Sequence, residues 1–383
     1  MGADIMASLG AFGGGIAGYI VPFLFVLAIV VFFHELGHFL IGRWCGVKVT
    51  AFSIGFGPEI IGFNDRYGTR WKLSAIPLGG FVKFFGDENA ASVPDHDAAA
   101  QMSPEERKVS FIHQPVRKRA AVVVAGPVAN FILAIVIFAA IFGTVGRQYT
   151  SARVDTVQPG SAAQTAGFQP GDLVTSIDGE KIETFADMQR IVSISAGEPL
   201  TVVVDRGGAP VTLKAKPELR ELKDNFGNVH RLGVLGIGRS MQPGDLKTRH
   251  YTPVQAVGEG AWETWSIVER TFSYIGGVFS GREAADQLGG PIRIAQVSGQ
   301  VATIGFVALM HLTAVLSVSI GLLNLFPIPL LDGGHLLFYA IEALRGRPLS
   351  ERSQEIGFRI GFAVVIMLMI FATFNDILHL ATS

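Results

Sequence analysis

Long apolar runs separated by polar segments dominate the pattern of hydrophobic positions in this chain. A helix needs about 20 predominantly apolar residues to cross a bilayer. Four stretches reach or approach this length. The first of them follows no Lys or Arg, so it is interpreted as a retained span rather than a signal peptide. The pattern therefore predicts four transmembrane helices, at residues 20–41, 120–142, 301–325 and 358–374.

A less apolar segment follows the first span. In residues 47–85, apolar and polar side chains partly alternate, and glycines and prolines interrupt the alternation. This pattern predicts short strands near the cytoplasmic mouth of the helices. Ser103 and Glu106 match a capping box, which predicts a short helix before the second span, after a linker at residues 87–100.

The segment between the second and third spans is the most soluble part of the sequence. Small residues after Gly160 predict a short helix that Gly167 ends, and turn and strand patterns follow. Residues 151–217 are therefore expected to form a separate small domain. Residues 218–300 mix aromatic and charged side chains, which fits an amphipathic helix at the outer membrane interface or an ordinary packed helix equally well.

Composition supports a membrane protein with a soluble portion. Charged residues make up 16% of the chain, against about 25% in typical soluble domains. Hydrophobic residues make up 49%, and the mean hydropathy is +0.41. A net charge of −1 gives no basis for nucleic-acid binding, so no nucleic-acid partner is expected. The single cysteine, Cys45, cannot form an internal disulfide.

Basic residues near the span ends predict the orientation. The segment between the first two spans is rich in Lys and Arg, including the cluster at residues 117–119, and several arginines lie between the last two spans. Both ends of the chain carry almost none. We therefore expect both basic segments in the cytoplasm, and both termini and residues 147–300 on the other side.

The sequence His34-Glu35-Leu36-Gly37-His38 lies inside the first apolar run. On a helix, residues four apart share one face, so both imidazoles can bind the same metal ion. Glu35 is offset by about 100°, close enough to take a proton from a metal-activated water. Ionisable groups at membrane depth are expensive and mostly functional, which favours a hydrolytic metal site over a chance match.

A catalytic zinc needs a third protein ligand besides two histidines. The third apolar run breaks at residues 324–334, where prolines and glycines indicate irregular backbone at membrane depth. Asp332 lies in this break, near the cytoplasmic end of its span, as His34 and His38 lie near that end of theirs. Asp332 is therefore the best candidate for the third ligand, with a helix N-cap as the alternative.

Four other polar residues in apolar surroundings are weaker candidates. Asn324 can contact a substrate carbonyl or cap a helix, and Asn130 can orient a ligand, stabilise negative charge or bond to a neighbouring helix. His335 is interpreted as facing the interface rather than supporting Asp332. His311, in the middle of a span, is interpreted as a packed histidine of the bundle.

Three motifs together resemble the site-2 protease family of intramembrane zinc metalloproteases. They are the segment from His34 to His38, Gly126-Pro127 with Asn130, and the run from Asn324 to Gly333 with its two prolines and Leu331-Asp332. The pattern at residues 160–179 resembles a PDZ domain, as in the bacterial regulator-of-sigma-E protease type. One PDZ pattern is present here, whereas the best-studied relatives have two.

The resemblance implies one Zn²⁺ per chain, bound by His34, His38 and Asp332, with Glu35 as the general base. It implies that Asn324 and Asn130 position the substrate. It further implies that the β segment at residues 47–85 receives an unwound substrate helix by strand addition.

The expected fold is a polytopic α-helical membrane protein with four transmembrane helices, a small cytoplasmic-side β segment and an inserted extracytoplasmic α+β PDZ domain. The expected parts are a first transmembrane helix with both histidines (1–46), the β segment, linker and short helix (47–119), a second transmembrane helix (120–146), the PDZ domain (147–217), an extracytoplasmic amphipathic region (218–300), a third transmembrane helix with the Leu-Asp-Gly motif (301–345) and a fourth transmembrane helix (346–383).

The expected function is that of a bacterial inner-membrane zinc endopeptidase that cleaves single-pass membrane proteins, such as anti-sigma factors or signal-peptide remnants, in regulated intramembrane proteolysis. Its expected partners are these substrates, the lipid bilayer, and a peptide or C-terminus at the PDZ domain. The alternative is a non-catalytic membrane PDZ adaptor with a structural metal site.

Overall fold

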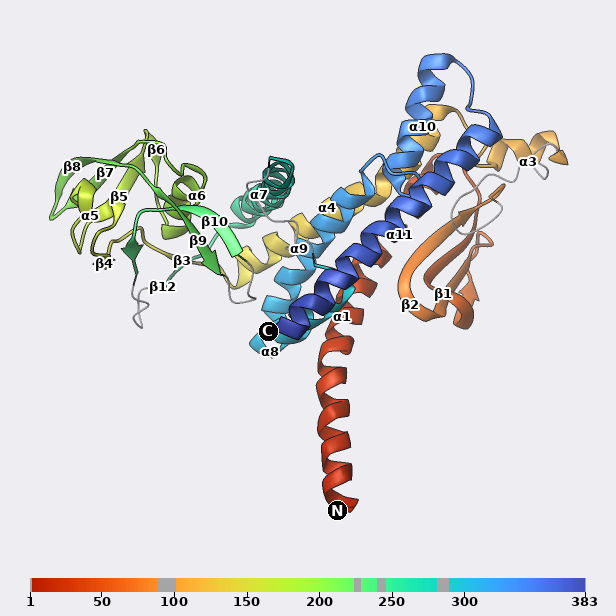
Figure 1. Ribbon diagram of the computed structural model, residues 1–383. Coiled ribbons are helices and arrows are strands. Elements are labelled where there is room, and N and C mark those ends of the chain that lie inside the picture. Colours follow the sequence, from red (N-terminus) through yellow and green to blue (C-terminus); the bar gives the residue numbers. More distant parts are fainter. Residues whose placement is uncertain (1, 88–100, 224–228, 240–245, 281–288, 383) are drawn as a thin grey trace. The chain divides into compact units, whose positions relative to one another are not determined.

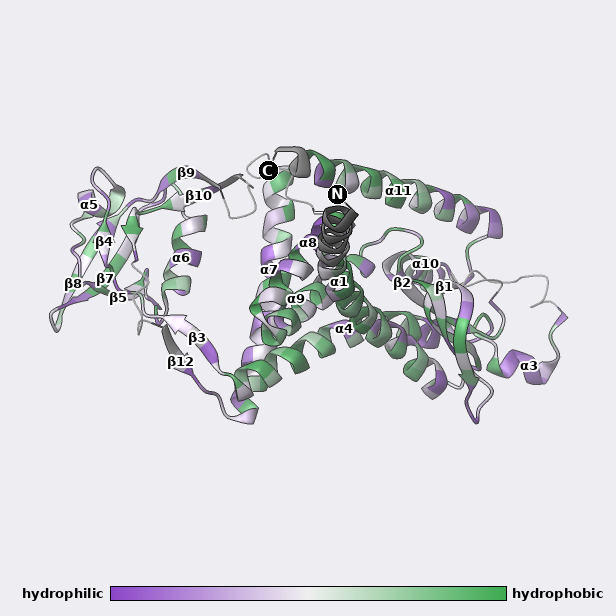
Figure 2. Ribbon diagram, turned by 90° about the horizontal axis from the view of Figure 1, so that it is seen from below, coloured by the Kyte–Doolittle hydropathy of each residue, from purple (hydrophilic) through white to green (hydrophobic). Residues whose placement is uncertain are grey.

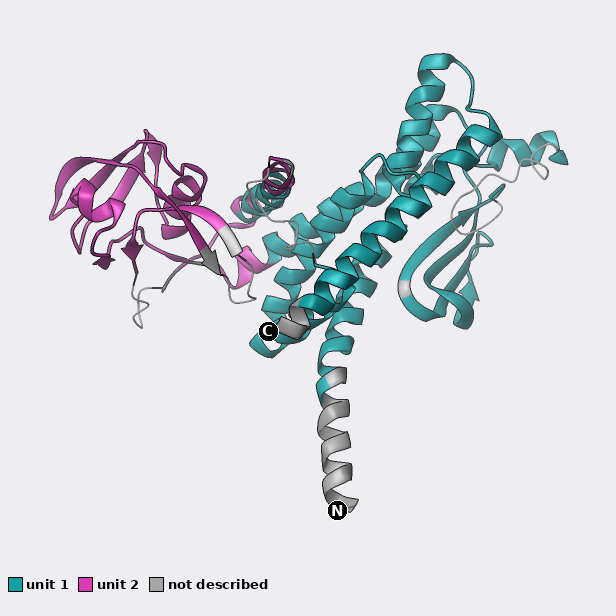
Figure 3. Ribbon diagram, viewed as in Figure 1, with its two compact units in different colours: residues 1–140, 256–271, 288–382 teal, residues 141–255, 272–287, 383 magenta. Residues whose placement is uncertain are grey.

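The computed structural model describes residues 2–87, 101–223, 229–239, 246–280 and 289–382 (Figure 1). The linker predicted at residues 87–100 lies almost entirely outside these described residues. The chain divides into two compact units, coloured separately in Figure 3. Unit 1 comprises residues 1–140, 256–271 and 288–382, and unit 2 comprises residues 141–255 and 272–287.

The helices of unit 1 carry the apolar runs. Among the described residues, four helices are long and apolar enough to cross a membrane, and they are mostly green in Figure 2. The apolar parts span Ala17–Trp44, Val116–Thr144, Phe306–Asn324 and Glu351–Leu378. They belong to α1 (Gly2–Trp44), α4 (Val116–Thr144), α9 (Phe306–Asn324) and α11 (Glu351–Thr382).

The third span differs from its predicted bounds. Residues 301–304 belong to a preceding helix, α8 (Pro291–Ile304), because Gly305 adopts a φ of 136° that favours glycine and ends it. A non-helical segment at residues 325–331 then separates α9 from α10 (Asp332–Arg345). The irregular backbone predicted at residues 324–334 is therefore present at residues 325–331. The part expected at residues 301–345 as the third transmembrane helix consists of the end of α8, α9 and α10, because Gly305 and the two prolines interrupt the helical backbone.

The predicted short strands are two long ones, β1 (Val49–Asn64) and β2 (Arg70–Phe84), paired antiparallel. Both strands bend, so that residues 49–54 pair with residues 80–84 on one side and with residues 70–73 on the other. Gly55 and Gly79 have φ values of 86° and 93°, which let the backbone turn sharply at the bends. The hairpin thus forms a small curved sheet.

Aromatic packing holds this hairpin against α1. The Phe52 ring is buried, stacks on Trp71 at 4.3 Å and meets Phe39 of α1 edge to face at 5.6 Å. Beyond the hairpin, α3 (Pro104–Val109) begins with the predicted capping box, because Ser103 and Glu106 each accept a hydrogen bond from the other's backbone N–H. The aromatic contacts of Phe52 attach the hairpin to α1, the helix that carries both histidines.

Unit 2 is built around an antiparallel sheet with two short helices. The helix α5 (Ala162–Ala166) is capped by Ser161, and Gly167 ends it as predicted. Val154, Ile177 and Val202 lie in the hydrophobic core of this unit. The sheet has the order β6 (Glu180–Lys181), β5 (Leu173–Ile177), β7 (Leu200–Arg206), β8 (Ala209–Ala215), and the helices are α5 (Ala162–Ala166) and α6 (Phe185–Ile194).

The predicted boundary at residue 217 falls inside unit 2. Leu235 is buried in the core of this unit, and its carbonyl accepts a hydrogen bond from the Ala163 N–H. Short polar strands without an apolar run conceal this continuation in the sequence. The additional pairs are β3 (Arg147–Thr150) with β12 (Leu246–Arg249), β4 (Thr156–Val157) with β11 (Ile237–Gly238), and β9 (Glu218–Lys223) with β10 (Val229–Val234).

The aromatic segment after unit 2's last strand forms α7 (Pro253–Phe279). One face of this helix is packed, with Ala256 and Ile267 buried. The other face exposes Trp262 and Trp265. The helix therefore combines a packed face with an exposed aromatic face, and its place at a membrane interface stays a prediction.

Candidate metal centre

Helix α1 brings His34 and His38 together. They lie one turn apart, their rings are 4.9 Å apart edge to face, and their Nε2 atoms are separated by 3.3 Å. Gly37 lies between them in sequence, where a Cβ atom would collide with the Ala125 carbonyl oxygen of α4. Glycine at this position therefore allows α4 to approach the face that carries the histidines.

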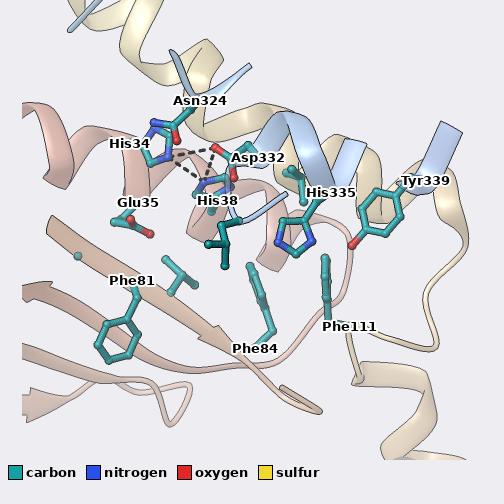
Figure 4. A pocket seen from close by; sticks show the side chains of 14 residues that line it. His34, Glu35, His38, Phe81, Phe84, Phe111, Asn324, Asp332, His335 and Tyr339 are labelled. Atoms are coloured by element: carbon teal, nitrogen blue, oxygen red, sulfur yellow. Dashed lines mark hydrogen bonds and ion pairs between the residues drawn. The ribbon is translucent and has the colours of Figure 1, made fainter. Parts of the chain in front are cut away.

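Asp332 enters the same site from the first turn of α10. The N-cap of this helix is Leu331, so Asp332 does not act as the cap. A Cβ at Gly333 would collide with the carbonyls of Leu325 and Phe326, so the chain folds tightly back on the end of α9. The tight turn directs the Asp332 carboxylate at the two imidazoles (Figure 4).

The three side chains form a nearly regular triangle of ligand atoms. The Asp332 Oδ2 atom lies 3.2 Å from His34 Nε2 and 3.5 Å from His38 Nε2. Tetrahedral zinc with ligand distances of about 2.0–2.2 Å has ligand atoms about 3.3–3.6 Å apart. The spacing of the three atoms therefore fits zinc.

The carboxylate supports the same conclusion by its lack of hydrogen bonds. Asp332 Oδ2 is buried and accepts no hydrogen bond from any described residue. Leaving a buried carboxylate oxygen without a donor costs on the order of several kcal/mol. A cation between this oxygen and the two imidazoles would remove that penalty, so the residues present fit a metal.

Glu35 lies beside the cluster and faces the same cavity (Figure 4). The cavity has a volume of about 190 Å³ and is lined by all three candidate ligands, Glu35 and residues of β2. The Glu35 carboxylate lies next to the Val82 backbone of β2. The hairpin thus holds a candidate base next to the candidate metal ligands.

The hairpin itself is fastened to the end of α1 by an ion pair. Arg43 of α1 donates hydrogen bonds to Asp65 and Thr69, at the turn between β1 and β2. Burial opposes ionisation of Asp65, but hydrogen bonds from Thr69, Trp71, Tyr67 and Arg43 lower the pKa of this carboxyl to about 2. Asp65 is therefore charged at neutral pH and holds the turn closed.

The two asparagines from the sequence motifs occupy different places. Asn324, at the end of α9, lines the cavity, and its Nδ2 donates to the Ile320 carbonyl at 3.1 Å. Asn130 is fully buried in α4 and is not among the described residues that line the cavity. Its Nδ2 lies 3.3 Å from His34 Nδ1. Asn130 is thus behind a candidate ligand rather than in front of the substrate.

The two remaining histidines also differ from each other. His311 packs edge to face on Phe138 at 5.2 Å, in keeping with its interpretation as a packed histidine. His335 lines the cavity instead of facing the interface, with its ring 5.5 Å from Phe358. Tyr339 and Phe111 also line the cavity near His335, although no motif in the sequence singles them out (Figure 4). The sequence indicates these two residues only as aromatic side chains near the ends of the apolar runs.

Comparison with known proteins identifies the class. Residues 22–368 match the model of peptidase family M50, so the chain belongs to this family. The sequence-based assignment to the site-2 protease family of zinc metalloproteases is thereby confirmed.

Similar proteins match over nearly their whole lengths. "Putative zinc metalloprotease Atu1380" of Agrobacterium fabrum is 55% identical over 97% of this chain and 99% of its own. The metalloprotease MmpA of Caulobacter vibrioides is 41% identical over 94% and 95% of the two chains, respectively. The protease RseP of Yersinia pestis is 32% identical over 92% and 97%.

One solved structure matches part of the chain. It is the PDZ domain of the SdrC-like protein of Listeria monocytogenes, with 17% identity over 22% of this chain and 83% of that one. The TM-score is 0.17, which is too low to support an argument about the fold. The assignment of a PDZ domain to this part of the chain therefore stays a prediction from its sequence pattern.

Proposed function

We propose that this chain is an intramembrane zinc endopeptidase that cleaves single-pass membrane proteins, with His34, His38 and Asp332 as the zinc ligands. The observation that carries this proposal is the triangle of ligand atoms around a buried oxygen without a hydrogen-bond donor. Three protein ligands beside a cavity match a catalytic zinc site, which keeps one position open, better than a closed structural site with four ligands.

Zinc, when bound, supplies a Lewis acid that polarises a scissile carbonyl and increases the acidity of water. Glu35 accepts a proton from the attacking water and donates it to the leaving amine nitrogen. Glu35 and Val82 of β2 both line the cavity, so the hairpin lies beside the proposed base. Asn324, which lines this cavity, is proposed to donate a hydrogen bond to the substrate backbone.

The substrate class follows from the membrane setting and from the hairpin. A peptide bond inside a helix is protected by the helix's own hydrogen bonds, so a transmembrane substrate has to unwind before cleavage. Residues 80–84 pair with residues 49–54 on one side, and several of them line the cavity. We propose that the unwound substrate adds to this strand as a further strand.

We propose that the protein lies in the bacterial inner membrane, with the basic segments in the cytoplasm and both termini and unit 2 outside. The PDZ-like unit 2 then binds a peptide or a free C-terminus, or restricts access of substrates that still carry an outer domain. Anti-sigma factors and signal-peptide remnants are the proposed substrates in regulated intramembrane proteolysis.

The test compares the wild-type enzyme with Glu35→Gln in cells that express a tagged single-pass reporter. We expect cleavage by the wild type and none by the variant, with equal zinc content in both purified proteins, because Glu35 moves a proton and does not bind the metal. Cleavage by Glu35→Gln at the wild-type rate would contradict the assignment. Absence of zinc from the wild type would instead contradict the metal site. Bound zinc without any reporter cleavage by the wild type would favour the adaptor alternative, whose metal site is structural.

A further inference from the structure

One face of α4 contacts both candidate zinc-binding histidines from behind. Val122, Gly126 and Asn130 are four residues apart, so they lie above one another on one side of the helix. A Cβ at Gly126 would collide with Nε2 of His38 and come within 2.9 Å of His34 Cε1. Glycine in the middle of this face therefore makes room for both rings, and the residues on either side contact one histidine each.

His38 has an unambiguous partner on this face. Its Nδ1 lies 2.9 Å from the Val122 carbonyl oxygen. A carbonyl can only accept, so Nδ1 carries the proton and donates it. The Nε2 lone pair of the neutral ring is therefore free, and this is the atom that faces Asp332 and His34.

His34 requires the same proton arrangement but faces a different group. Its Nε2 is the atom in the ligand triangle, so a neutral ring that binds zinc has its proton on Nδ1. The atom opposite Nδ1 is the Asn130 Nδ2, at 3.3 Å, which is also a donor. Two donors cannot share a hydrogen bond, so this orientation of the amide does not suit a zinc-bound His34.

The other end of the Asn130 amide resolves the conflict. Its Oδ1 atom is buried and accepts no hydrogen bond from the described residues. The oxygen and nitrogen of an amide have almost the same size, and their positions follow from the hydrogen bonds they make. A 180° rotation about the Cβ–Cγ bond places Oδ1 opposite His34 Nδ1, where it accepts the proton of that nitrogen.

We propose that Asn130 is a positioning residue that holds His34 in the tautomer able to bind zinc, by accepting a hydrogen bond from Nδ1–H at Oδ1. The inference rests on the proposed zinc site and replaces the expectation that Asn130 positions the substrate. Its full burial and its absence from the described cavity lining argue against contact with a substrate. Partners of this kind fix the orientation of metal-binding histidines and increase their basicity.

A purely structural role for Asn130 can be separated from this one. The backbone carbonyl of Asn130 accepts a hydrogen bond from Ser317 Oγ of α9 at 2.8 Å. The Cβ atom of Asn130 also lies close to Gly321 of α9. These contacts are made by the backbone carbonyl and Cβ of Asn130, and the hydrogen bond from Ser317 does not use the side-chain amide. Ser317→Ala therefore removes the contact between helices and leaves the partner of His34 in place.

The experiment measures zinc affinity of the purified full chain by competition with a chelator. Asn130→Leu keeps the approximate side-chain volume and removes the acceptor, so we expect zinc to bind about 10–100-fold more weakly. Asn130→Asp restores an acceptor for Nδ1–H and should bind zinc within a few-fold of the wild type. Ser317→Ala should bind zinc as the wild type does. Thermal unfolding of each metal-free variant reports whether it folds.

Two results would overturn the inference: wild-type zinc affinity in a folded Asn130→Leu, or equally weak binding by the Asp and Leu variants. If Asn130→Leu does not fold, Asn130→Ala takes its place with the same expected loss. Failure of the underlying function would look different, because the wild type itself would then bind no zinc in this titration.

Discussion

Two aspartates with a buried carboxylate oxygen, one in each unit, differ in how that oxygen is satisfied. Asp172 in unit 2 is 1% exposed, and both of its oxygens accept hydrogen bonds from Arg206 at 2.8 Å. The Gln169 backbone N–H donates to it as well. Asp332 in unit 1 directs Oδ2 at two imidazole nitrogens and accepts no hydrogen bond there from any described residue.

The difference separates a structural carboxylate from a candidate metal ligand. A buried charge is tolerated when its lone pairs are satisfied, as those of Asp172 are. A buried oxygen left without a donor, among atoms spaced as metal ligands are, fits the cation that we propose for this site. Burial of a carboxylate oxygen alone does not distinguish the two cases, because the hydrogen-bond partners of that oxygen have to be known as well.

The largest expected effect lies at Asp332. Asp332→Ala should lose zinc and reduce reporter cleavage to background, because two histidines alone bind zinc weakly and leave the site incomplete. Metal analysis and reporter cleavage measure the two effects. Asp172→Asn is the matched control and should retain zinc. Equal zinc content in Asp332→Ala and the wild type would break the contrast between the two aspartates.

The close approach of α4 to the histidines gives a second large effect. Gly126→Ala places a methyl group against both rings, which should displace the ligand atoms and lower the zinc content severely. Gly18→Ala in α1 is the control, because a Cβ there meets nothing within 4 Å. Full zinc content in Gly126→Ala would mean that α4 and α1 can separate without harming the site.

In unit 2 the expected effect is one of stability. Arg206→Ala leaves Asp172 buried without its partner and should destabilise this unit by about 2 kcal/mol. That is less than the roughly 3–5 kcal/mol for a fully buried pair, because Arg206 is 30% exposed. Limited proteolysis of the full chain measures the change. The exposed pair of Lys181 and Glu183 is the control, and Lys181→Ala should change stability by less than about 0.5 kcal/mol.

The same aspartate should make unit 2 sensitive to acid. Burial by itself raises the pKa of Asp172. The Arg206 guanidinium and the Gln169 N–H lower this pKa by more than burial raises it, so the pKa lies below its ordinary value. The stabilisation is present above the unfolded-state pKa of about 3.9 and is lost as pH falls through the folded-state pKa. Proteolysis of unit 2 should accelerate below about pH 4 in the wild type. If proteolysis of Asp172→Asn accelerates below the same pH, the acid sensitivity of unit 2 comes from groups other than Asp172.

The smallest expected effect concerns the hairpin anchor. Asp65→Asn weakens the ion pair with Arg43 but keeps an acceptor for the turn, so a loss of about 1 kcal/mol in local stability is expected. Hydrogen exchange of the β1–β2 turn should increase, and reporter cleavage should fall modestly because the hairpin holds Glu35. Unchanged exchange at the turn would show that aromatic packing alone secures the hairpin.

Local patterns predicted much of the fold. The apolar runs identify the four candidate spans, because the length of such a run reflects the thickness of the membrane it crosses. The spacing of His34 and His38 places both rings on one face through helix geometry alone. The prolines and glycines around Asp332 indicate irregular backbone, since these residues interrupt regular hydrogen bonding. Each of these inferences depends on interactions within a few residues.

The tertiary structure decided what depends on the packing of distant segments. Whether Asp332 reaches the histidines depends on how the segment after α9 folds back, which no local pattern contains. The positions of α1 and α4 put Asn130 behind His34 rather than in the cavity, and the sequence left both roles open. Leu235 belongs to the core of unit 2 because strands distant in sequence pair there. Spacing along one element follows from backbone geometry, whereas convergence between elements follows from how their side chains pack.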